Sequence, residues 1–207
     1  MFRWGALFLH LKGMRHYIAF AFVLFAAGIF VGGTEHSLSG FLQGQLQGMG
    51  EIANSLQQSD NPGLRMFLFI FLNNTIKSIL VIYLGALFGI FPVIFLVVNG
   101  MVLGFLYSHL EASGANALAM FVQGVLPHGI IEIPIVVLAA AYGLRLGTMM
   151  FKGLFAMVSP KSRTVASQIE SMFKHSLPLT GFITVMPLIA AVIESTFTVW
   201  LLEQKLF

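Results

Sequence analysis

Residues 17–31 read YIAFAFVLFAAGIFV, a run without a charged side chain that continues through Gly32 and Gly33. A helix needs about 20 apolar residues to cross the hydrocarbon core of a bilayer, so this run is long enough. A cleavable signal peptide is the competing interpretation, but no small-x-small cleavage site stands before a soluble domain. We therefore expect a membrane-spanning helix here, preceded by the basic residues Lys12 and Arg15.

The composition of the whole chain agrees with that expectation. Of 207 residues, 57% are hydrophobic and 9% are charged, whereas about a quarter are charged in an ordinary soluble domain. There is no cysteine, which excludes a disulfide scaffold and a zinc site with Cys ligands. The net charge of +3 reflects basic loops that flank the membrane, so we expect no nucleic acid partner. Residues 1–207 are predicted to form a single integral membrane domain in contact with lipid.

Further apolar segments follow along the chain. They cover residues 66–88, 91–107, 130–144 and 179–202, and the first two are close enough to form a hairpin. Residues 117–126 are apolar but too short to cross alone. We predict an all-α, polytopic bundle of five full crossings, with a short half-helix before Pro127.

Two polar stretches separate these segments. An outer one, about residues 34–65, contains apolar side chains at helical spacing: Leu42, Leu46, Met49, Ala53 and Leu56. An inner basic loop, about residues 148–178, contains a similar set: Val165, Ile169, Met172 and Phe173. Each pattern predicts an amphipathic helix, and the first is expected to lie on the membrane surface.

The charges orient the bundle. One group of segments is strongly basic: Arg3, Lys12, Arg15, Arg145, Lys152, Lys161, Arg163 and Lys174. The alternate segments hold most of the acids: Glu35, Glu51, Asp60, Glu111 and Glu203. Because basic loops stay on the cytoplasmic side, we predict that the N-terminus is inside and the C-terminus outside.

Four ionisable residues lie within the apolar segments, namely Lys77, His128, Glu132 and Glu194. Each costs about 2.5 to 3.5 kcal/mol in hydrocarbon, so each needs a partner or a function. His128 and Glu132 are four residues apart and would share one helix face just after the Pro127 break. Gly129 beside them would let another helix approach closely.

Two roles for these residues stay open. They form a binding or proton-handling centre, as in the broken-helix sites of transporters, or a buried clamp in which Lys77, Glu132 and Glu194 neutralise one another. Asn73, Asn74 and Asn99 are expected to hydrogen-bond across helices.

Small residues recur at four-residue spacing, which permits close helix crossing. The pairs are Gly28 and Gly32, Gly85 and Gly89, Gly100 and Gly104, and Gly143 and Gly147. Whether they pack within one subunit or between two is undecided from the sequence. We expect a homodimer, because these faces exceed the need of one five-helix bundle.

Catalytic motifs are missing from the sequence. There is no nucleophile elbow, phosphate-binding loop, HExxH or paired cysteine, and the other histidines are dispersed. We therefore expect no enzyme activity, no catalytic residues, no cofactor and no metal site.

Two motifs carry a family resemblance. Residues 98–104 read VNGMVLG and residues 126–134 read LPHGIIEIP. With residues 139–147, they make the chain resemble the stage II sporulation protein M family. The family pattern of a membrane Asn, an NGxxxG, a PHGxxExP core and a late Glu falls on Asn73 or Asn74, Asn99 with Gly100 and Gly104, residues 127–134, and Glu194.

The resemblance implies a multi-pass protein of the bacterial cytoplasmic membrane. In endospore formers, the sporulation member is required for engulfment of the forespore. There it looks like a non-enzymatic scaffold for two peptidoglycan-degrading partners, the stage II sporulation proteins D and P. Related proteins also occur in organisms that do not sporulate. The alternative function is therefore a small transporter, channel or lipid-handling protein that uses the PHGxxE break.

Overall fold

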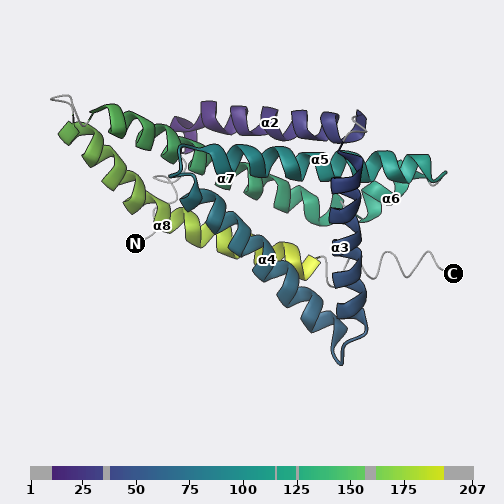
Figure 1. Ribbon diagram of the computed structural model, residues 1–207. Coiled ribbons are helices and arrows are strands. Elements are labelled where there is room, and N and C mark those ends of the chain that lie inside the picture. Colours follow the sequence, from purple (N-terminus) through teal and green to yellow (C-terminus); the bar gives the residue numbers. More distant parts are fainter. Residues whose placement is uncertain (1–10, 35–37, 115, 125, 157–161, 194–207) are drawn as a thin grey trace.

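The computed structural model describes residues 11–34, 38–114, 116–124, 126–156 and 162–193, and within them every regular element is a helix (Figure 1). The helices are α2 (Arg15–Thr34), α3 (Ser39–Gln57), α4 (Pro62–Leu84), α5 (Ile90–Ala112), α6 (Ala117–Gly124), α7 (Leu126–Ala156) and α8 (Ser162–Ile193). The prediction of an all-α fold is confirmed for these residues.

Four helices are long and apolar enough to cross a membrane. They are α2, α4, α5 and the part of α7 from Gly129 to Phe155. The short helix α6 lies where we predicted a half-helix. The apolar part of α8, Leu179–Ile193, matches the start of the fifth predicted crossing, and its remainder lies outside the described residues. The count of five crossings and the orientation stay predictions.

Helices α2 and α5 pack backbone against backbone, side by side (Figure 1). A Cβ added at Gly28 would stand 2.5 Å from the Val97 carbonyl oxygen. A Cβ at Gly104 would collide with the Ile29 carbonyl, and one at Gly32 with Met101. The spacing of small residues therefore serves a close crossing, which lies within the chain.

A second glycine contact fixes the turn between α4 and α5 against α7. Phe88 and Gly89 adopt left-handed backbone angles, with φ of 56° and 77°, which reverse the chain direction. A Cβ at Gly147 would collide with the backbone of Gly89, and one at Gly85 with Gly143. The predicted hairpin is present, but its arms diverge, because α5 packs mainly against α2 while α4 packs against α7 and α8 (Figure 1).

The region between α7 and α8 differs from the inner loop that we expected. Helix α7 continues to Ala156, and α8 runs without a break from Ser162 to Ile193. The predicted amphipathic helix and the last apolar segment are therefore parts of one helix. Residues 148–156 contain several good helix formers, which favours the continuation of α7 to Ala156: Met149, Met150, Lys152, Leu154 and Ala156.

Helix α3 crosses the end of the bundle, from the end of α2 and α5 to the start of α4 (Figure 1). It lies where the sequence pattern predicts an amphipathic helix. Within α3, Leu42 is fully buried, while Leu46, Ala53 and Leu56 are partly buried.

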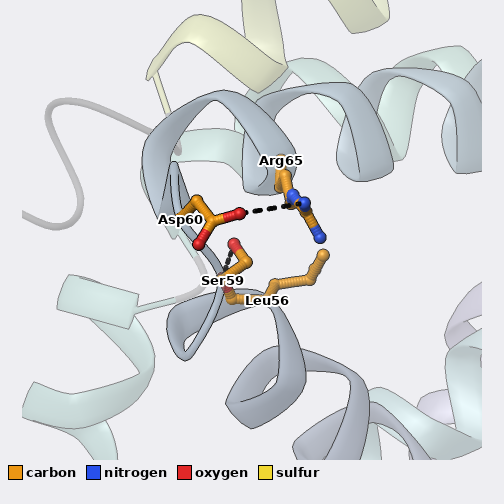
Figure 2. A network of polar contacts seen from close by, with 4 residues as sticks. All are labelled: Leu56, Ser59, Asp60 and Arg65. Atoms are coloured by element: carbon orange, nitrogen blue, oxygen red, sulfur yellow. Dashed lines mark hydrogen bonds and ion pairs between the residues drawn. The ribbon is translucent and has the colours of Figure 1, made fainter.

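The turn from α3 into α4 is short and polar (Figure 2). The Ser59 hydroxyl donates to the Leu56 carbonyl at 2.6 Å, and Asp60 and Arg65 form an exposed ion pair at 4.0 Å. The Asn61 side chain accepts a hydrogen bond from the Leu64 amide at 3.3 Å and caps α4. Pro62 follows as the first helical residue, where its missing N–H costs nothing.

Candidate polar site

The residues that we expected to form a polar centre lie mainly on α4 and α7. Helix α6 ends at Gly124 and α7 begins at Leu126, so Pro127 lies in the first turn of α7, before Glu132. The residue between the two helices lies outside the described residues. Glu132 is partly buried and Gly129 is buried. Helical spacing puts Glu132 on the same face of α7 as buried Ile135 and Gly143, which faces the bundle. The His128 side chain and Glu194 lie outside the described residues.

Lys77 on α4 acts on Glu132 through its charge. The Lys77 side chain is nevertheless exposed. The two side chains form no ion pair within 4.0 Å, so Lys77 and Glu132 interact over a longer distance. A tight, mutually neutralising clamp is thus not formed by these two side chains.

The three asparagines form hydrogen bonds within their own helices. The Asn99 amide donates to the Phe95 carbonyl at 2.7 Å, and the Asn73 amide donates to the Asn74 side-chain oxygen at 3.3 Å. These side chains are partly buried. Their amides thus reduce the cost of burial locally, whereas we expected bonds between helices.

Hydrogen bonds between helices come instead from tyrosines that we did not single out. The Tyr142 hydroxyl donates to the Met172 carbonyl of α8 at 2.8 Å. Tyr83 on α4 is 3.3 Å from the Thr180 hydroxyl on α8. The only signal in the sequence is the residue type, because a buried tyrosine usually finds a partner for its hydroxyl.

Helix α4 also buries two hydroxyl side chains, those of Thr75 and Ser78. The Thr75 hydroxyl is enclosed without a hydrogen-bond partner among the described residues. With Asn74 and Lys77, these residues make one turn of α4 polar in the middle of an apolar helix. This turn and Glu132 are the candidate polar site.

The chemistry available at this site is limited to charge and hydrogen bonding. It offers a carboxylate, an ammonium, amides and hydroxyls. The part of the chain that the structure describes contains no group of three His, Cys, Asp or Glu residues that could hold a metal ion. Such groups can bind a proton, a cation or a polar headgroup.

The fold defines a class of protein before any comparison. Four of the described helices can span a bilayer, and large apolar side chains such as Phe22, Phe30 and Ile94 are exposed on them. Such side chains face lipid in membrane proteins, so the fold is typical of a helical membrane protein.

Comparison with known proteins identifies the family. The chain belongs to the stage II sporulation protein M family, whose model matches residues 18–199. The resemblance in the sequence motifs is thereby confirmed, and it links the chain to a sporulation-related family of membrane proteins.

One relative is the uncharacterized protein MJ0706 of Methanocaldococcus jannaschii. It is 31% identical over 139 residues, which are 67% of this chain and 58% of the relative. The chain thus matches a little over half the length of that protein. No solved structure matches the chain.

Proposed function

We propose that this protein is a non-enzymatic scaffold of the bacterial cytoplasmic membrane that takes part in forespore engulfment. In this role it anchors peptidoglycan hydrolases, the stage II sporulation proteins D and P, at the membrane. Membership of the stage II sporulation protein M family supports a role in sporulation. The observation that carries the anchoring role is the uncovered face of α3.

This face of α3 combines apolar side chains with open glycines. Phe41 is 51% exposed and Ile52 is 41% exposed. Beside them, Gly40, Gly44 and Gly48 recur every four residues, and a Cβ added at any of them would meet nothing within 4 Å. The glycine pairs of the bundle are occupied by neighbouring helices, whereas this stripe is open. A partner helix would therefore find room for close approach.

The charge of α3 favours a protein partner over a lipid surface. The helix contains no Lys or Arg and has Glu51 as its charged residue. Helices that lie on anionic membranes are typically rich in Lys and Arg on their polar face. With the N-terminus inside, α3 lies outside the membrane, where peptidoglycan hydrolases act.

The test replaces one open glycine. The Cβ of Gly44→Leu meets nothing within 4 Å, so we expect thermal stability that is unchanged or slightly raised and roughly tenfold less capture of proteins D and P from membranes. Gln43→Leu, on another face of α3, is the matched control and should capture normally. Normal capture by Gly44→Leu would contradict the proposal that α3 is the surface that binds proteins D and P.

A second candidate function is a small transporter, channel or lipid-handling protein. It is favoured by Glu132, whose carboxylate is partly buried and attracted by Lys77 without a direct ion pair. We expect Glu132→Gln to lower ion or lipid flux in proteoliposomes if this function is present. Flux that is equal in the natural protein, in Glu132→Gln and in empty vesicles would rule it out.

A further inference from the structure

Basic side chains gather where α2 begins and α7 ends. Lys12, Arg15 and Lys152 are all exposed. The hydroxyls of Tyr17 on α2 and Thr148 on α7 form a hydrogen bond at 2.8 Å. Since Arg15 precedes Tyr17 by two residues and Lys152 follows Thr148 by one helical turn, this bond brings the basic residues to the same end of the bundle.

Acidic residues do not neutralise these three within the described chain. Glu51, Asp60 and Glu111 lie at the opposite end (Figure 1), and Asp60 pairs with Arg65. Glu170, on α8, forms no ion pair within 4.0 Å with Lys12, Arg15 or Lys152. Lys12, Arg15 and Lys152 therefore form a cationic patch.

An apolar surface adjoins this patch. Phe151 immediately precedes Lys152 and is exposed, as are Phe88 and Phe155. The Phe151 ring contacts Phe88 edge-on with centroids 6.0 Å apart, and contacts Phe155 at 5.0 Å. The three rings thus form one aromatic ledge at the same end of α7. A site with charges beside exposed rings matches a molecule that has an anionic head and apolar chains.

We propose that this end of the protein binds an anionic phospholipid. The phosphate lies against Lys12, Arg15 and Lys152, and the acyl chains run toward the bilayer centre along Phe151 and Phe88. Basic side chains near the cytoplasmic leaflet attract anionic lipids, and the predicted orientation places this patch there. The aromatic ledge distinguishes a lipid from a free phosphate ion, which would need only the charges.

Native mass spectrometry of the full chain in detergent tests the proposal. We expect the natural protein to retain added phosphatidylglycerol over phosphatidylcholine. The triple variant Lys12→Gln, Arg15→Gln, Lys152→Gln should bind phosphatidylglycerol more weakly by roughly fivefold for each charge removed. Arg65→Gln, at the opposite end, is the control and should bind normally. Equal retention by the triple variant and the natural protein would overturn the proposal.

Two further variants separate loss of the site from loss of folding. Lys12→Arg with Lys152→Arg keeps both charges and should retain phosphatidylglycerol, whereas loss of the lipid in this variant counts against the charge-based site. Phe151→Ala should weaken retention of the lipid without changing the basic patch. If Phe151→Ala binds normally and inorganic phosphate displaces the lipid, the patch is a simple anion site and the lipid proposal fails.

Discussion

Gly143 stands where two other helices leave no room for a side chain. A Cβ there would lie 2.5 Å from the Val81 carbonyl oxygen and 2.7 Å from the Pro92 ring. We expect Gly143→Ala to lower the free energy of unfolding by about 1 to 3 kcal/mol, because backbone would have to move. Thermal unfolding in detergent measures the effect.

Gly181 on α8 supplies the control for that prediction, since a Cβ there would meet nothing within 4 Å. Gly181→Ala should leave stability unchanged or raise it by up to about 1 kcal/mol, the difference in helix propensity. Equal losses at Gly143 and Gly181 would show that helix packing is looser than the structure indicates.

Tyr142 makes a second prediction at the scale of the residue. Its side chain is 1% exposed, and its hydroxyl ties α7 to the Met172 carbonyl. Tyr142→Phe should cost about 1 kcal/mol of stability. Tyr17→Phe removes the exposed bond to Thr148 and should cost less, as measured by denaturant titration of both variants. The reverse order would contradict the structure.

Two variants at the start of α4 test whether its N-terminal cap or its ion pair stabilises the helix. Asn61 caps the helix through the Leu64 amide, so Asn61→Ala should destabilise it by about 1 kcal/mol. Asp60→Ala breaks only an exposed ion pair at 4.0 Å and should change stability by a few tenths of a kcal/mol. Hydrogen exchange of the first turn of α4 distinguishes the two variants.

The helices could be predicted from the sequence, because long apolar runs form them and local residues such as Asn-Pro or Gly mark their ends. Helix α3 was predicted from five apolar residues at helical spacing. The continuous α8 was not, because its first half is amphipathic and its second half apolar, and a change of composition looks like a boundary. Helix α8 continues through this change and through Pro178 and Pro187, although each proline removes one helical hydrogen bond.

Partners in space were much harder to predict than elements. The glycine spacing indicated close crossings, but which pair meets which depends on the tertiary arrangement. The same limit explains the asparagines, which bond within their own helices, and Tyr142, whose partner lies 30 residues away. Contacts between distant residues leave no periodic pattern in a single sequence.

At the scale of the molecule, the absence of cysteine makes the topology directly testable. Ser113→Cys follows α5 and Lys152→Cys lies near the end of α7. With the N-terminus inside, a membrane-impermeant maleimide should label Ser113→Cys in intact cells and should label Lys152→Cys only after lysis. The opposite pattern would show that the orientation is reversed. Labelling of both sites in intact cells would contradict the prediction that α7 crosses the membrane.

The glycine faces also bear on the predicted homodimer. Gly28, Gly32, Gly100 and Gly104 pack together within one chain, and so do the glycines of the α4 to α5 turn and of α7. These faces therefore give no support to a dimer. The open stripe on α3 is a glycine surface on which a second copy, or another protein, would find room to pack.

The contact between α2 and α5 has a consequence for biogenesis. During synthesis, α2 is made well before α5, and the glycines that it packs against belong to this helix, which is made only after α3 and α4. Until then, its own flat glycine surface has no protein neighbour. The ribosome and the insertion machinery must therefore release α2 into lipid, or hold it, until α5 arrives to complete the pair.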